Sequence, residues 1–176
     1  PRVATLSTCS RSGDWMTRTM NSTQPLSPDM LGKYDYFSGM SDTALTELAD
    51  RLEVIELPAG TVIVQQDTPP DAFYFVRQGE VEVTKEIAPG KITRIAVVSN
   101  GRGFGEVALL TYSHRSCSVT AMTPVTLYRL AKQDFDDIII MDTAFMGTLV
   151  KQAGTDARYN RIKNLKPFAM LEPEKM

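Results

Sequence analysis

Turn signals recur at short intervals through the middle of the chain and leave room only for short strands between them. Four of these signals combine Pro, Gly or Asp in ways that favour tight turns: Pro58-Ala59-Gly60, Asp67-Thr68-Pro69-Pro70-Asp71, Gln78-Gly79 and Pro89-Gly90. The predicted strands are residues 54–57, 61–65, 72–76, 80–86, 91–99, 118–122 and 125–130. Many short strands at this spacing predict a mainly β fold, a sandwich or barrel rather than a parallel sheet.

Within the strand at 80–86, Val81 and Val83 alternate with Glu80, Glu82 and Thr84. Successive side chains of a strand point to opposite faces of its sheet. The alternation therefore predicts one buried face and one face in water.

Helices are predicted on both sides of the β region. Ser41 is suited to cap a helix from about Asp42 to Glu53, whose apolar residues recur at helical spacing: Leu45, Leu48, Ala49 and Leu52. After the last strand, a second helix buries a stripe of Phe135, Ile138 and Ile139. Asp142 can cap a third helix, whose apolar positions are Phe145, Met146, Leu149, Val150 and Ala153. Gly147 and Gly154 suit either a movable helix or close packing against a neighbour.

A glycine-rich turn leads into a short helix before Arg115. Gly103 and Gly105 precede good helix formers, so backbone N–H groups can be presented at a helix start, where an anion is favoured. Arg115 offers a planar set of donors that suits a phosphate, and Glu106 is an acceptor that suits a sugar hydroxyl. The stretch predicts a ligand that carries a phosphate next to a sugar hydroxyl.

This stretch resembles the phosphate-binding cassette of cyclic nucleotide-binding domains, whose pattern is F-G-E-L-A-L, a short loop, and P-R-A-A-T-V. The match runs without a gap from Phe104 to Val119, and these residues are called the cassette below. The resemblance implies that Glu106 binds the ribose 2′-hydroxyl and Arg115 the cyclic phosphate, while backbone N–H groups of Gly105, Val107 and Ala108 complete the anion site. The chain departs from the pattern at His114, Cys117 and Ser118, and none of these changes removes a charge or donor that the ligand needs.

The position after the cassette Arg often distinguishes the two ligands of the family, and here it is Ser116. A Ser hydroxyl could contact a guanine, turn toward the phosphate, or cap its own backbone. No second residue that would read a guanine is identifiable on the strands. The residues thus favour cAMP over cGMP by a small margin.

The resemblance extends over roughly residues 27–165, where P-A-G-T-x-I and F-Y-x-V-x-x-G-x-V-x-V precede the cassette in the family order. It implies a cyclic nucleotide-binding β-roll, a jelly-roll fold, with an N-terminal helix and two C-terminal helices that hinge when ligand binds. Arg158, Tyr159 and Ile162 are candidate base contacts. Gln66 stands where the family often has Gly, which affects the expected geometry of that turn only.

Composition narrows the class of protein. The chain has 176 residues, 43% of them hydrophobic, and a net charge of −2, which gives no general attraction to nucleic acid or an anionic membrane. No apolar run approaches the length of a membrane span, so a cytoplasmic location is expected. Cys9, Cys117 and the single His114 are too few for a disulfide framework or a histidine-rich metal site. No cofactor is expected beyond the nucleotide ligand.

The chain divides into three predicted parts. Residues 1–26 are dense in Ser, Thr and Arg and have no apolar periodicity, which predicts a flexible leader. Residues 27–166 form the predicted cyclic nucleotide-binding domain. The segment 167–176 restates the sequence around Tyr36 and Phe37, which indicates the start of a second copy. Tandem copies resemble the regulatory parts of cyclic-nucleotide-dependent protein kinases.

The expected function is therefore that of a non-catalytic sensor domain that binds cAMP or cGMP and moves its C-terminal helices. Its expected partners are a second domain of the same kind and an effector or kinase subunit. Three alternatives stay open: a ligand-free interaction module of the same fold, the sensor domain of a DNA-binding activator, and a haem-based gas sensor. For haem ligation the chain offers only Cys9 and His114.

Overall fold

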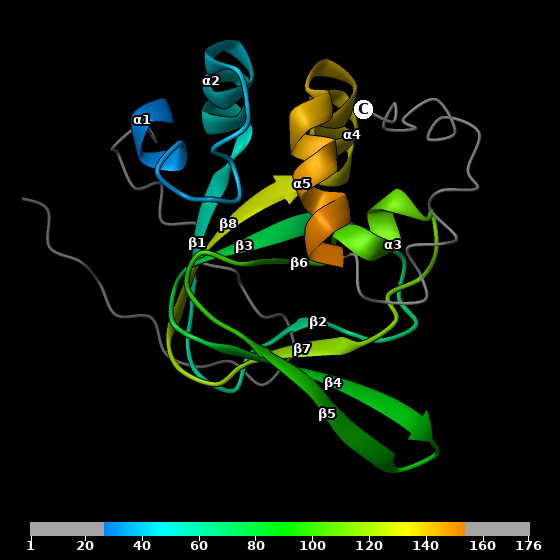
Figure 1. Ribbon diagram of the computed structural model, residues 1–176. Coiled ribbons are helices and arrows are strands. Elements are labelled where there is room, and N and C mark those ends of the chain that lie inside the picture. The colour runs from blue at the N-terminus through cyan, green and yellow to red at the C-terminus, as the bar shows by residue number, and fades with distance from the viewer. Residues whose placement is uncertain (1–26, 154–176) are drawn as a thin grey trace, which may run out of the picture.

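The structure, a computed structural model, describes residues 27–153. Two four-stranded sheets form a roll, and helices from both ends of this segment lie over one of the sheets (Figure 1). The helices are α1 (Pro28–Leu31), α2 (Asp42–Arg51), α3 (Glu106–Leu110), α4 (Lys132–Met141) and α5 (Thr143–Ala153). The strands are β1 (Glu53–Leu57), β2 (Val62–Val64), β3 (Ala72–Gln78), β4 (Val81–Ala88), β5 (Lys91–Val98), β6 (Gly103–Phe104), β7 (Ser118–Ala121) and β8 (Val125–Ala131).

The two sheets are antiparallel throughout the described residues. The first has the order β1-β8-β3-β6 and the second the order β2-β7-β4-β5. The predicted mainly β fold with flanking helices is confirmed. Sequence analysis missed β6, because its two residues are too few to show an alternating pattern.

Strand β3 is buried on both faces and joins the two cores of the domain. Its residues from Ala72 to Val76 are all buried. Phe73 and Phe75 belong to a core between the first sheet and the helices, whereas Ala72, Tyr74 and Val76 belong to a core between the two sheets. Cover on both faces explains why this strand is a continuous apolar run rather than an alternating one.

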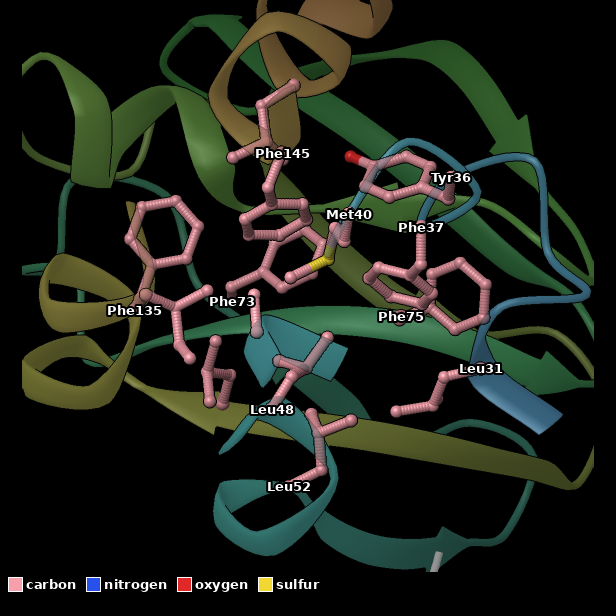
Figure 2. Packing of buried hydrophobic residues seen from close by; sticks show 14 of the residues in the cluster. Leu31, Tyr36, Phe37, Met40, Leu48, Leu52, Phe73, Phe75, Phe135 and Phe145 are labelled. Carbon is pink, nitrogen blue, oxygen red and sulfur yellow. The ribbon is translucent and has the colours of Figure 1, made fainter. Parts of the chain in front are cut away.

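Aromatic rings from distant parts of the chain meet between the first sheet and the helices (Figure 2). Phe37, in the α1–α2 connection, lies 4.8 Å from Phe75 between ring centroids. Phe73 lies 5.6 Å from Phe135 of α4 and 6.3 Å from Phe145 of α5. These rings attach the N-terminal and C-terminal helices to the same strand, β3.

Two helix starts are tied together by Ser41 and Asp142. Ser41 Oγ accepts a hydrogen bond from the N–H of Ala44 at the start of α2, and Asp142 Oδ1 accepts from the N–H groups of Ala144 and Phe145 at 2.9 and 3.0 Å. Both predicted caps are confirmed. Asp142 Oδ2 also accepts from Ser41 N at 3.0 Å and from Ser41 Oγ at 3.2 Å. Burial acts to raise the pKa of the Asp142 carboxyl, but these hydrogen bonds outweigh burial and lower it.

Helix α2 ends at Arg51, two residues before the predicted end at Glu53. Leu52 is already extended, with φ −74° and ψ 129°, and Glu53 pairs with Arg129 as the first residue of β1. Pairing of β1 with β8 therefore keeps the last two residues of the helical pattern out of the helix.

The β4–β5 hairpin joins the core only in its inner part. Val81 is fully buried and Val83 is partly buried, but in the outer part of the hairpin Ile92 is 67% exposed and Ile95 is 52% exposed. The predicted alternation concerns Val81 and Val83 and does not extend to this outer part. The outer part is exposed because β7 pairs with β4 only from Val81 to Thr84, and the hairpin extends beyond the end of β7 (Figure 1).

Several predictions fall outside residues 27–153. These are the flexible leader at 1–26 with Cys9, the candidate base contacts Arg158, Tyr159 and Ile162, Gly154, and the second-domain start at 167–176. None of the described helices is long and apolar enough to cross a membrane.

Candidate functional site

The cassette enters α3 through a glycine in the left-handed region. Gly105 has φ 90° and is the N-cap of α3. A Cβ atom at Gly105 would lie 2.6 Å from Arg115 Nη1, so both the backbone conformation and the close approach of the guanidinium require glycine. The first-turn N–H groups of a helix, here at Glu106, Val107 and Ala108, have no acceptor within the helix.

Arg115 is held in the interior by three oxygen atoms. Its Nη1 donates to Gly105 O at 2.8 Å, and its Nη2 donates to Asp71 Oδ1 at 2.8 Å and to Ala72 O at 2.6 Å. The side chain is 2% exposed. A guanidinium has five N–H donors, and these bonds account for three of them. The guanidinium is fixed beside the start of α3 with further donor capacity at Nε and Nη1.

The backbone of Arg115 is fixed as well. Its N–H donates to Thr68 O at 2.8 Å, and its carbonyl accepts from the N–H of Asp67 at 2.8 Å. Asp67 has φ 65°, so the left-handed residue of this turn comes directly after Gln66, where the family often has glycine. Ser118 Oγ accepts from Gln66 N at 3.0 Å. The turn before β3 therefore positions the loop that carries Arg115.

Asp71 is a part of this arrangement that sequence analysis used only as a turn residue. Besides Arg115, it accepts from the Tyr74 hydroxyl at 3.2 Å and from Arg129 Nη2 at 3.4 Å. Burial acts to raise the pKa of the Asp71 carboxyl, but the hydrogen bond and charge of Arg115 outweigh burial and lower it. An acidic residue directly before an apolar strand was the only available signal, because its partner lies far along the chain.

The other predicted site residues surround this centre. Glu106 is the first residue of α3 and is 8% exposed, Val107 is partly buried, and Ala108 is 5% exposed. Ser116 is partly buried, and its hydroxyl lies 3.8 Å from Cys117 Sγ. His114 is exposed. The structure thus gathers the predicted phosphate and sugar residues at one helix start, with Ser116 next to Arg115.

Helix α5 lies against this site. It contacts α3 directly, and the two helices are neighbours in Figure 1. Phe145 near its start packs on Phe73, and Asp142 fixes its first turn to Ser41. Helix α5 therefore packs against the short helix that begins at Gly105.

No group of three or more His, Cys, Asp or Glu side chains that could hold a metal ion occurs in residues 27–153. Of the two candidate haem ligands, His114 is exposed and Cys9 lies outside the described residues. The chemistry gathered at the cassette is that of an anion site beside a buried carboxylate.

The family described as the cyclic nucleotide-binding domain matches residues 54–142, which is half of the chain. The chain belongs to the cyclic nucleotide-binding domain family. The family resemblance predicted from the cassette is thereby confirmed. The matched range includes the whole cassette, Asp71 and the Asp142 cap.

Relatives of this cyclic nucleotide-binding domain include regulatory proteins of kinases. A cAMP-dependent protein kinase regulatory subunit from Aspergillus fumigatus is 37% identical over 93 residues, which cover 53% of this chain and 22% of the relative. Another such subunit, from Dictyostelium discoideum, is 40% identical over 92 residues, which cover 51% of this chain and 28% of the relative. A cGMP-dependent protein kinase, isozyme 1, from Drosophila melanogaster is 34% identical over 103 residues, which cover 57% of this chain and 13% of the relative. The chain spans less than a third of the length of each of these relatives.

Solved structures agree with the β-roll. The regulatory domain of Toxoplasma gondii PKA, crystallised with cAMP, has a TM-score of 0.67 at 25% identity, covering 73% of this chain and 49% of that one. The catabolite activator protein of Thermus thermophilus has a TM-score of 0.62 at 24% identity, covering 82% and 63%, and shows the fold alone. The predicted cyclic nucleotide-binding β-roll is confirmed.

Proposed function

We propose that this domain is a sensor in which a cyclic nucleotide binds at the start of α3 and acts on α5. The observation that carries the proposal is the position of Arg115, buried and held by Gly105 O and Asp71 Oδ1 beside the first turn of a helix. A fixed guanidinium next to first-turn N–H groups is a site for a singly charged phosphate. Membership of the family supports this reading of the geometry.

In the proposed complex, the cyclic phosphate accepts hydrogen bonds from the remaining donors of Arg115 and from the N–H groups of Gly105, Val107 and Ala108. Glu106 accepts a hydrogen bond from the ribose 2′-hydroxyl. Because Glu106 is 8% exposed, its carboxylate is poorly screened by water, and a ligand without that hydroxyl should bind more weakly because it loses this hydrogen bond.

The proposed response is a shift between two positions of α5. The ligand can move this equilibrium only by binding one position more tightly than the other. The contact between α3 and α5 supplies such a difference, since it joins the anion site to the helix that moves.

For the ligand we propose cAMP. The cAMP-dependent relatives and the cAMP complex of the Toxoplasma gondii protein support it, and Ser116 is compatible with it. A tenfold preference for cGMP that Ser116→Ala abolishes would instead make Ser116 the residue that reads the base.

In the longer protein we propose that the domain works as a regulatory part of a kinase system, next to a second copy that begins near residue 167. The domain itself performs no catalysis in this proposal, binds no nucleic acid, and acts in the cytoplasm. The relatives that carry kinase names support this assignment.

The test is calorimetric titration of the 176-residue chain with cAMP and cGMP. Arg115→Ala removes a charged partner from a desolvated site, a loss of about 2 to 5 kcal/mol, so affinity should fall at least about thirtyfold. Arg115→Lys keeps the charge without the planar set of donors, so its affinity should lie between those of the parent and of Arg115→Ala. Arg94→Ala is the matched control, since Arg94 is on the exposed hairpin, bonded to Glu82.

Circular dichroism checks that each variant keeps the fold. A parent chain that binds neither nucleotide would favour the ligand-free interaction module. A folded Arg115→Ala variant with parental affinity would remove Arg115 from the site. The DNA-binding alternative is tested separately, by binding of the full-length protein to duplex DNA with and without cAMP.

A further inference from the structure

Tyr36 carries a hydroxyl into the interior of the molecule. The residue lies in the connection between α1 and α2, and its side chain is 2% exposed. Its ring lies 5.5 Å from Phe37, 5.9 Å from Phe73, 5.5 Å from Phe75 and 6.5 Å from Phe145 between centroids (Figure 2). A phenylalanine ring would make the same contacts, so packing alone gives no reason for the hydroxyl.

The hydroxyl lies against the backbone that leads into the cassette. A Cβ atom at Gly103 would be 2.8 Å from the Tyr36 hydroxyl oxygen and 2.5 Å from the ring of Phe73. Glycine at this position is therefore what lets the hydroxyl approach so closely. Gly103 is in β6, which leads directly through Gly105 into α3.

Within residues 27–153 the Tyr36 hydroxyl makes no hydrogen bond. A buried hydroxyl without a hydrogen bond is costly, and folded proteins contain few such groups. The hydroxyl at this position is explained if another state of the molecule supplies it with a hydrogen-bond partner.

The charged groups around the hydroxyl indicate what that partner is. Burial in the first place, and the Glu106 carboxylate in the second, raise the pKa of Tyr36 well above its ordinary value, while Arg102 acts in the opposite sense. The hydroxyl therefore keeps its proton at neutral pH and is available as a donor. An ionised carboxylate is an acceptor only, so the two groups are chemically complementary.

We propose that Tyr36 is a positioning residue for the sugar site: with a cyclic nucleotide bound, its hydroxyl donates a hydrogen bond to Glu106 and holds that carboxylate toward the ribose 2′-hydroxyl. The inference rests on the proposed function, because it needs Glu106 to receive a ribose. The ring of Tyr36 also contacts Phe145 of α5, so the same side chain links sugar recognition to the helix that responds.

Tyr36→Phe tests this, since it removes the hydroxyl and keeps the ring. Calorimetry with cAMP and with 2′-deoxy-cAMP should show about a tenfold loss of affinity for cAMP and no change for 2′-deoxy-cAMP. On a Glu106→Ala background the same substitution should have no further effect on cAMP. Tyr34→Phe, in the same connection, is the matched control and should change neither affinity, because it keeps the ring that packs on Phe75 and leaves the Tyr36 hydroxyl in place.

A second measurement uses the ligand-free protein. If the hydroxyl has no partner before ligand binds, Tyr36→Phe should melt at the parental temperature or above it. A melting temperature several degrees lower would overturn the inference, and so would an equal loss for both nucleotides or a loss that persists without Glu106. A parent that binds no cyclic nucleotide refutes the proposed function and this inference together, and titration of the parent alone reveals it.

Discussion

Gly105 satisfies two requirements at once, because it has a left-handed backbone and lies against the guanidinium of Arg115. Gly105→Ala should lower the free energy of unfolding by about 1 to 2 kcal/mol through backbone strain, and should also displace Arg115 and weaken nucleotide binding. Gly60→Ala is the matched control: its φ is 85°, and a Cβ there meets nothing within 4 Å. Urea unfolding should show a loss for both variants, at least as large for Gly105→Ala as for Gly60→Ala, whereas calorimetry should show lost affinity only for Gly105→Ala. Equal affinities would mean that Arg115 tolerates the added methyl group.

The residues that we propose to contact the ligand were identified from the sequence, but the residues that hold them in place were not. Glu106 and Arg115 lie in one short motif, so their proposed roles could be inferred from the local sequence. Asp71 reaches Arg115 across 44 positions of sequence, and Tyr36 approaches the cassette from before the first strand. Such contacts depend on how strands pair in space, which local spacing does not encode.

At the scale of elements, the Asp142 tie is the feature with the clearest consequence. Asp142→Ala removes the cap of α5 and its hydrogen bonds to Ser41, so the free energy of unfolding should fall by about 2 kcal/mol at neutral pH. Asp50→Ala, an exposed change on α2, should stay within about 0.5 kcal/mol of the parent. Thermal melts compare the two, and equal melting temperatures would show that the tie adds no stability.

The lowered pKa of the Asp142 carboxyl predicts how the stability of the domain changes in acid. Its pKa is lowered in the folded state, so its contribution is fully present above the unfolded value of about 3.9 and is lost as pH falls through the folded value. The parent should therefore lose its advantage over Asp142→Ala below about pH 4, and the two stability curves should converge. A constant difference down to pH 2 would assign the effect of the substitution to packing instead of charge.

The elements themselves were predictable where a cap or a run of several residues marked them. The Ser41 and Asp142 caps are examples, since each carries its signal within three residues. Strand β6 was not predictable, because two residues show no period. The outer part of the β4–β5 hairpin has a strand sequence, but its exposure depends on how far the neighbouring strand β7 extends.

At the scale of the whole molecule, buried apolar side chains are concentrated around β3, whereas the outer part of the β4–β5 hairpin is exposed. Phe73→Ala should cost about 3 to 5 kcal/mol of unfolding free energy, because Phe73 is 1% exposed and contacts rings from both terminal helical segments. Ile92→Ala should cost less than about 0.5 kcal/mol, because Ile92 is 67% exposed on the hairpin. Urea titration measures both. A large loss at Ile92 would indicate that the hairpin is covered in solution.

The overall architecture followed from strand spacing together with the family resemblance, and each supplied a different part. Spacing alone allowed a sandwich or a barrel. The order of strands in each sheet, with β1 beside β8, joins residues as distant as Glu53 and Arg129, and turn signals say nothing about that pairing. Only a known relative with the same succession of motifs could supply it.

The aromatic core between the helices and β3 has a consequence for synthesis of the chain on the ribosome. Phe37 emerges first, whereas Phe145, which lies 5.8 Å from it in the finished fold, follows 145 − 37 = 108 residues later. At a translation rate of about 5 to 20 residues per second, this wait lasts roughly 5 to 20 seconds. During that interval the apolar side chains of the α1–α2 segment lack part of their cover, and the nascent domain presents the kind of surface that chaperones bind.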